Sequence, residues 1–259
     1  GRTFDGSDMT APTGNGPYKV GRLAAGQFIE YDRVEDYWGR DLPMRRGLFH
    51  FDRIRIEFYR ERQAGFEAFK KGEILFRQEF TSRTWATEYN FPAINEGKVV
   101  KREFPAELRP SMQAWAVNLR REKFKDIRVR EAIAHCFDFE WTNRNLFYGA
   151  YERANSCFER SDFKAEGMPT PEELALLEPF RAELPEAVFG EAVVQPLSDG
   201  SGRDRQLLRR ARGLLTEAGW KAQGNRLVND RGEALSIEFL VQEEGLARLT
   251  APFVENLRA

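Results

Sequence analysis

The chain has 259 residues and a formal net charge of −1, with 41% hydrophobic and 31% charged residues. This much apolar material can build a folded core, and the balanced charge gives no electrostatic reason to expect nucleic-acid or anionic-membrane binding. No run approaches the roughly 20 apolar residues that span a bilayer. We therefore expect a globular protein of one large or two ordinary domains.

The first predicted elements are strands followed by a short helix. A hairpin is predicted from strands at residues 18–20 and 28–34, because polar and apolar residues alternate in the second of them. Residues 48–59 contain the clearest strand, in which isoleucines alternate with arginines. Residues 62–71 form a short helix that ends at a glycine.

Extended segments come next along the chain. Residues 74–80, 98–104 and 112–119 are predicted as strands, and residues 81–97 as irregular to helical. Strands that alternate with helices are typical of an α/β domain with a mixed sheet.

Residues 126–141 (DIRVREAIAHCFDFEW) contain a helix that Asp126 is expected to cap. Its apolar residues recur at helical spacing and predict a buried stripe, made of Val129, Ala132, Ile133, Cys136 and Phe137. His135 lies off this stripe, so we expect a surface histidine next to a small core cysteine. Their side chains point about 100° apart on a helix, which disfavours a shared metal ion.

The helical pattern continues over residues 141–148 and ends at Gly149. Residues 153–204 are rich in proline, glycine and glutamate, and they predict an irregular excursion with one helix opening at residues 169–173.

The last part of the chain predicts two further helices. Residues 205–218 form an amphipathic helix, with Gly219 in a left-handed conformation and Trp220 folded back onto the last turn. Residues 221–234 are predicted as a turn-rich link and residues 235–241 as a strand. A helix begins at Gly245.

Common catalytic and cofactor motifs are absent from the sequence. It contains no Walker loop, no Gly-x-Ser-x-Gly and no His-Glu-x-x-His. The glutamate pairs at 172–173 and 243–244 are interpreted as solvated helix ends. We therefore expect no enzyme, no metal and no cofactor. Cys136 and Cys157 leave two alternatives open, a single disulfide or two free thiols.

Aromatic and amide side chains are the remaining candidates for chemistry. Such groups line ligand clefts, where aromatic faces contact side chains and amides bind backbone groups. The four candidate ligand-binding residues are Trp115, Asn118, Trp141 and Tyr148.

Several motifs resemble the extracellular solute-binding proteins of dipeptide and oligopeptide ABC transporters, known as family 5. They follow the family's order: Gly14–Tyr18 resembles G-T-G-P-Y, Tyr37–Gly39 resembles Y-W-G, Phe51–Ile54 resembles F-D-x-I, Lys71–Ile74 resembles the G-E-x-D turn, Val117–Ile133 resembles L-N-x…F-x-D-x-R-V-R-x-A-[IL], and Leu214–Trp220 resembles L-L-x-E-A-G-[WY]. The YejA-like branch is indicated by Arg120-Arg121, Phe137–Trp141, Asn145–Gly149 and Ala165–Leu177.

This resemblance implies a type II periplasmic-binding-protein-like fold, α/β with two lobes and mixed sheets, present here only in part. Residues 1–120 would be the returning segment of lobe I and residues 121–259 the first half of lobe II. The chain begins at Gly1 and ends within a helical pattern, so we expect a fragment of a longer protein. A signal peptide and the acidic residue that pairs with a peptide's amino terminus would lie outside it.

The resemblance also implies a function. The protein would be a periplasmic monomer that binds a peptide ligand between its lobes and delivers it to the permease subunits of an ABC transporter. The four candidate residues flank the predicted crossover between lobes. Two alternatives remain open: the sensor domain of a transcriptional regulator with the same fold, and a hydrolase built on this scaffold.

Overall fold

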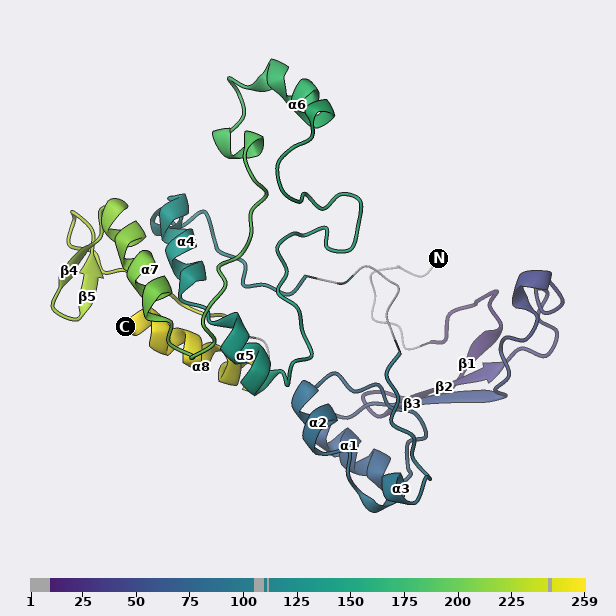
Figure 1. Ribbon diagram of the computed structural model, residues 1–259. Coiled ribbons are helices and arrows are strands. Elements are labelled where there is room, and N and C mark those ends of the chain that lie inside the picture. Colours follow the sequence, from purple (N-terminus) through teal and green to yellow (C-terminus); the bar gives the residue numbers. More distant parts are fainter. Residues whose placement is uncertain (1–9, 105–109, 111, 242–243) are drawn as a thin grey trace. The chain divides into compact units, whose positions relative to one another are not determined.

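A computed structural model describes residues 10–104, 110, 112–241 and 244–259. These residues form two compact units (Figure 1). The first unit contains the chain up to Glu79 together with Phe91–Lys98, and the second contains Phe80–Asn90 and the chain from Val99 onward.

The first unit is built on a three-stranded antiparallel sheet, in the order β1 (Tyr18–Ala24), β2 (Phe28–Arg33) and β3 (Arg53–Glu57). Tyr18 pairs with Arg33, and Tyr31 pairs with Ile54. Gly26 has a φ of 70° in the tight turn between β1 and β2, a conformation that favours glycine. The predicted hairpin and third strand are confirmed, although β3 is shorter than its predicted range.

Glu30 is the most buried charge of this sheet, with 1% of its side chain exposed. It accepts hydrogen bonds from Arg22 Nε at 2.8 Å and from Arg55 Nη1 at 2.9 Å, and Arg53 Nε lies 3.8 Å away. The bond from Arg22, then that from Arg55, outweigh the effect of burial and lower the pKa of Glu30 to about 2. One buried carboxylate on the central strand therefore binds arginines of both neighbouring strands.

The helices of the first unit pack through phenylalanines. Phe66 and Phe69 are the buried side chains of α1 (Arg62–Lys70). Both rings meet Phe91 edge to face, at centroid distances of 6.1 and 6.4 Å. Phe91 immediately precedes α3 (Pro92–Asn95), so these contacts join the two helices. A short 3₁₀ helix, η1 (Pro43–Arg45), lies between β2 and β3.

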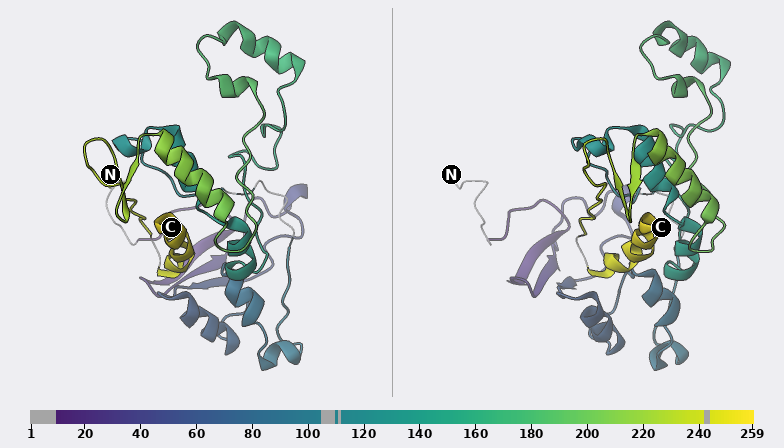
Figure 2. Two further views of the ribbon diagram at one scale, coloured as in Figure 1. Left: turned by 60° about the vertical axis from the view of Figure 1, so that its left-hand side comes forward. Right: turned by 90° about the vertical axis from the view of Figure 1, so that its left-hand side faces the viewer.

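The second unit has a helical core (Figures 1 and 2). This core lies between α4 (Ile127–His135), α7 (Arg205–Glu217) and α8 (Glu244–Arg258). Its buried residues are Ala132, Cys136 (the C-cap of α4), Ala211, Leu214 and Phe253. The predicted stripe is confirmed, with Ile133 and Phe137 packed against this core. Asp126 caps α4 by accepting a hydrogen bond from Arg128 N at 2.9 Å.

A second cluster buries Phe124, Val129 and Trp220. Gly219 has a φ of 91°, and Trp220 N donates to the carbonyl of Leu215 at 2.9 Å. This is the predicted left-handed helix end, and it turns the tryptophan back against α4.

The other elements of the second unit are shorter. The helix predicted to open at residues 169–173 is confirmed as α6 (Pro171–Leu177), which begins with a capping box in which Thr170 and Glu173 exchange side-chain-to-backbone hydrogen bonds. The remaining elements are α2 (Ser82–Thr87), η2 (Glu122–Phe124), α5 (Phe139–Leu146), η3 (Glu178–Phe180), η4 (Glu186–Phe189), β4 (Lys221–Gln223) and β5 (Arg226–Val228).

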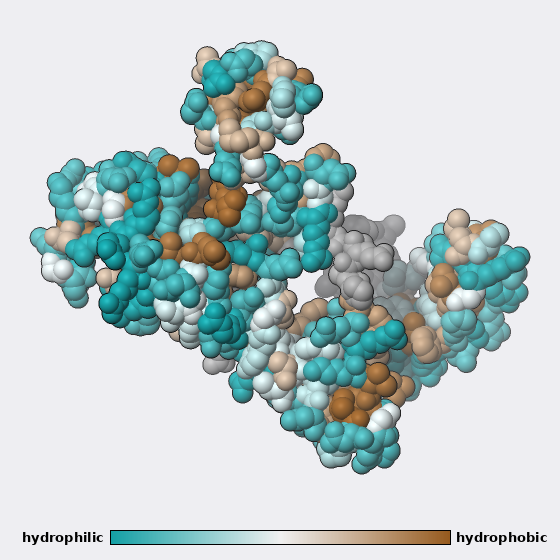
Figure 3. All heavy atoms as spheres, in the orientation of Figure 1, coloured by the Kyte–Doolittle hydropathy of each residue, from teal (hydrophilic) through white to brown (hydrophobic). Residues whose placement is uncertain are grey.

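Four predicted strands are wrong. Residues 74–80, 98–104, 112–119 and 235–241 belong to no sheet among the described residues. A strand needs a ladder of hydrogen bonds to a neighbouring strand, and none of these segments is paired in a sheet within the described part of the chain. Several of their large apolar side chains are exposed (96% for Leu75), and apolar residues are visible on the surface in Figure 3.

Two further predictions are corrected. The link at residues 221–234 contains the antiparallel pair β4 and β5, which a two-residue turn joins. The helical pattern around residue 141 is not continuous with α4: it restarts as α5 with Asp138 as its cap, and it ends at Leu146 rather than at Tyr148. Among the described residues no helix combines the length and apolar character that crossing a bilayer requires.

Candidate functional site

Trp115 stands on an aromatic cluster of the second unit. Its ring centroid lies 5.2 Å from that of Phe137, 5.4 Å from Phe253 and 6.0 Å from Phe239. These rings come from the end of α4, from α8 and from the segment before it, so three parts of the chain fix the indole. The residue remains 39% exposed, which leaves part of the ring available to a ligand.

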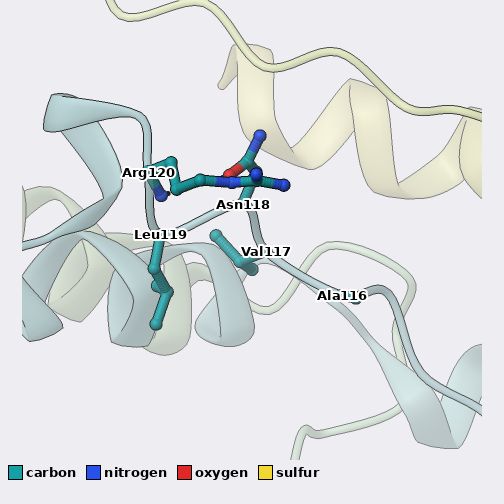
Figure 4. A pocket seen from close by; sticks show the side chains of 5 residues that line it. All are labelled: Ala116, Val117, Asn118, Leu119 and Arg120. Atoms are coloured by element: carbon teal, nitrogen blue, oxygen red, sulfur yellow. Dashed lines mark hydrogen bonds between the residues drawn. The ribbon is translucent and has the colours of Figure 1, made fainter.

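Asn118 lies in the segment Ala116–Arg120, which lines a shallow and open hollow (Figure 4). Its Oδ1 accepts from Arg120 N and its carbonyl accepts from Arg121 N, both at 3.1 Å. These bonds form a turn. Asn118 Nδ2 makes no hydrogen bond within the described residues and can donate one to a ligand.

Trp141 is held by the N-terminal turn of α5. Its backbone N donates to Asp138 Oδ1 at 2.9 Å, and its ring packs against the backbone of Gly202. A Cβ on Gly202 would lie 3.0 Å from the indole Cδ1 and Nε1, so only glycine fits here without a shift. The φ of Gly202, 86°, also favours glycine.

Asp138 is the hub of this region and is 5% exposed. Besides capping α5, its carboxylate accepts from Gly202 N at 2.8 Å and from the hydroxyl of Ser198. Asn256 of α8 donates to the carbonyl of Gly202 at 3.0 Å and to that of Cys136 at 3.1 Å. The start of α5, the loop at 198–204 and α8 are therefore locked together by polar contacts.

Glu140 extends the same network. Ser198 donates to Glu140 Oε2 through its backbone N at 2.9 Å and its hydroxyl at 2.6 Å. Burial acts to raise the pKa of Glu140, but the hydrogen bonds from Ser198 outweigh it and the pKa lies below its usual value. The carboxylate is therefore a fixed anion that accepts hydrogen bonds, not a proton donor.

Tyr148 lies just beyond the end of α5, with a φ of 57° and 45% of the residue exposed. Each of the four candidate ligand-binding residues is held by different neighbours. No hydrogen bond or ring contact joins any two of the four within the described residues.

The cysteines are free, and the described residues hold no cluster of three metal-binding side chains. Cys136 is buried, and this burial raises the pKa of its thiol to about 12, so it does not act as a thiolate. Cys157 is exposed. His135 is half-buried, and its Nδ1 donates to the carbonyl of Glu131 at 2.7 Å.

Sequence reasoning missed the hub formed by Asp138, Ser198 and Gly202. A signal for its first member was present, because an aspartate directly after the buried stripe that ends at Phe137 is a typical helix cap. Ser198 and Gly202 lie 60 and 64 residues further on, and no local pattern links them to Asp138.

Comparison with known proteins gives a family match over almost the entire chain. The model of "Bacterial extracellular solute-binding proteins, family 5 Middle" matches residues 2–258. The "Probable peptide-binding protein YejA" of Agrobacterium fabrum is 40% identical over 248 residues, which cover 95% of this chain and 40% of that protein. This chain therefore spans well under half the length of that relative.

Solved structures show the same fold at low sequence identity. NikA from Brucella suis, in complex with Fe(III)-EDTA, has a TM-score of 0.58 at 23% identity, over 95% of this chain and 41% of NikA. The oligopeptide-binding protein AppA from Bacillus subtilis, in complex with a nonapeptide, has a TM-score of 0.56 at 18% identity, over 94% and 40% of the two chains.

Proposed function

The chain belongs to family 5 of the bacterial extracellular solute-binding proteins, and on this basis we propose that it is part of a peptide-binding receptor for an ABC importer. Its fold is mixed α/β and covers part of the type II periplasmic-binding fold. Family and fold are those of solute-binding proteins, not of enzymes. Peptides are proposed as the ligand class because the chain is 40% identical, over 248 residues, to a relative named as a probable peptide-binding protein.

The proposed organisation has two lobes. Residues 1–120 would be the returning segment of lobe I, and residues 121–259 the first half of lobe II. Because the chain covers about 40% of its relative, the rest of the full-length protein would complete both lobes and the cleft. A hinge motion of the lobes would enclose the ligand. The receptor would work in the periplasm as a monomer and deliver the peptide to permease subunits.

The proposed ligand contacts are Trp115, Asn118, Trp141 and Tyr148. Trp115 offers an exposed part of an indole that three other aromatic rings hold in place, and such a rigid surface suits apolar side chains. The Oδ1 of Asn118 is already used to close the local turn. Its Nδ2–H is left as a donor, which suits a peptide carbonyl. Backbone contacts of this kind allow one cleft to accept many sequences.

Isothermal titration calorimetry on the full-length protein tests the proposal. The protein is first exposed to an equimolar panel of synthetic di- to octapeptides, the retained peptides are identified by mass spectrometry, and the tightest is titrated. Asn118→Ala should weaken its binding by about fivefold or more, because a peptide carbonyl loses its donor. Asn225→Ala, in the exposed turn between β4 and β5, is the matched control and should bind as the wild type does.

Retention of no peptide, combined with tight binding of a sugar or a metal chelate, would refute the proposal.

A further inference from the structure

We infer that Asn143 is a positioning residue: it locks the turn after α5 and thereby presents the ring of Tyr148 to the ligand. This inference rests on the proposed function, in which Tyr148 contacts a bound peptide. It adds a residue of α5 that sets the geometry of the site without touching the ligand.

The backbone after α5 adopts an unusual conformation. Tyr148 has a φ of 57° and Gly149 a φ of 75°, so two consecutive residues are left-handed. Glycine adopts this region readily, but a bulky aromatic residue does so at a cost in energy. Such a conformation persists where the surrounding structure enforces it, and it is found preferentially at functional sites.

The side chain of Asn143 enforces the turn. Its Nδ2 donates to the carbonyl of Tyr151 at 2.7 Å, and its Oδ1 accepts from Tyr151 N at 3.2 Å. The amide thus pairs with both backbone groups of one residue, as a neighbouring strand would. The carbonyl of Asn143 also accepts from Gly149 N at 2.9 Å. One residue therefore holds the backbone both within the bend, at Gly149, and just after it, at Tyr151.

A ring contact closes the same loop. The rings of Phe147 and Tyr151 meet edge to face, with centroids 4.6 Å apart. Phe147 and Tyr151 lie on either side of the two left-handed residues, Tyr148 and Gly149. Their rings pack on each other, and the ring of Tyr148 takes no part in this contact. The bend is over-determined by polar and aromatic contacts, and none of them uses the side chain of Tyr148.

Comparison with the other left-handed side chains shows that Tyr148 is distinct. Among the described residues, three that are not glycine have a positive φ: Phe49, Tyr148 and Arg160. The ring of Phe49 packs against two tyrosine rings, and Arg160 lies 3.8 Å from a carboxylate oxygen of Glu152. The ring of Tyr148 makes no recorded hydrogen bond or ring contact within the described residues.

Neither a hydrogen bond nor an aromatic contact of the tyrosine ring therefore accounts for the strained backbone within the described residues. The residue is 45% exposed on a backbone that its neighbours hold in place, and its ring offers both an apolar face and a phenolic hydroxyl. A peptide matches these groups, since its side chains can cover the face and its backbone can bond the hydroxyl.

The test uses the full-length protein and four variants: Tyr148→Gly, Asn143→Ala, the double variant, and Arg160→Gly as the matched control. Each is measured for its melting temperature without ligand and, by calorimetry, for its Kd for the tightest peptide of the synthetic panel. Tyr148→Gly should keep or raise the melting temperature, because glycine adopts the left-handed conformation without strain. It should weaken peptide binding by about fivefold or more, because the ring that contacts the ligand is lost. Arg160→Gly relieves the same conformation elsewhere and should leave the Kd unchanged.

The double variant separates positioning from general stability. Asn143→Ala should weaken binding in the wild-type background, but it should cause no further loss once Tyr148 is glycine. Additive losses, an unchanged Kd in Tyr148→Gly, or a melting temperature lowered by Tyr148→Gly would each overturn the inference. If Asn143→Ala does not fold, Asn143→Asp takes its place in the same comparison, because it keeps the oxygen that accepts from Tyr151 N and removes only the donor to the Tyr151 carbonyl. A wild-type protein that binds no peptide of the panel refutes the proposed function itself, and the inference falls with it.

Discussion

Asp138→Ala removes the hub that joins α5, the loop at 198–204 and α8. The carboxylate caps α5 through Trp141 N, and it also accepts from Gly202 N and from the Ser198 hydroxyl. Ser198 keeps a second acceptor in Glu140, so its hydroxyl is not left without a partner. Gly202 N loses the only acceptor recorded for it within the described residues.

The expected loss of stability follows from these contacts. Loss of a helix cap costs about 1 kcal/mol. A backbone N–H that loses its acceptor in a part-buried setting costs roughly 1–3 kcal/mol. The substitution should therefore destabilise the second unit by about 2–4 kcal/mol. Thr170→Ala removes only the exposed cap of α6 and should cost about 1 kcal/mol.

Hydrogen–deuterium exchange and urea unfolding of the full-length protein measure both variants. Asp138→Ala should speed exchange in α5 and in residues 198–204, and should leave exchange in the sheet β1–β3 unchanged. The urea midpoint should fall further for Asp138→Ala than for Thr170→Ala. Equal midpoints for the two variants, with unchanged exchange at 198–204, would refute the role assigned to Asp138.

Three other predictions concern single residues. The pKa of Glu30 is about 2 in the folded protein against an ordinary value of 4.5, so its stabilising effect is full above pH 4.5 and is lost as the pH falls toward 2; Glu30→Gln should flatten the fall in melting temperature over this window, and an unchanged slope contradicts the assignment. Native maleimide labelling followed by peptide mapping should modify Cys157 and spare the buried Cys136; labelling of both, or a disulfide between them, would be against the structure. Gly202→Ala should lower the melting temperature more than Gly232→Ala, because both have a positive φ but only the first Cβ would meet a neighbouring ring; equal shifts would show that the indole is not packed there.

Local signals predicted the helical parts of the chain well. Asp126, the stripe from Val129 to Phe137 and the end at Gly219-Trp220 are each encoded within a few neighbouring residues, and the structure confirms them. The motifs of the first unit also converge in space, since Trp38 Nε1 donates to the carbonyl of Asn15 at 3.0 Å and Tyr18 donates to that of Phe51 at 2.8 Å.

Features that depend on distant partners were not predictable. The segment at 74–80 has the composition of a strand, but a ladder requires a second strand that no local pattern supplies. Asp138 binds Ser198 and Gly202 across 60 and 64 residues. For the candidate site, the sequence suggested Tyr148 as a ligand contact, whereas its left-handed backbone and the hydrogen bonds of Asn143 to Tyr151 required coordinates.

The most direct test of the central claim is the Kd of the full-length protein for the tightest peptide in the di- to octapeptide panel. The proposed function predicts saturable binding of a peptide, weakened about fivefold or more by Asn118→Ala and unaffected by Asn225→Ala. Binding of no peptide, together with tight binding of a sugar or a metal chelate, would contradict it.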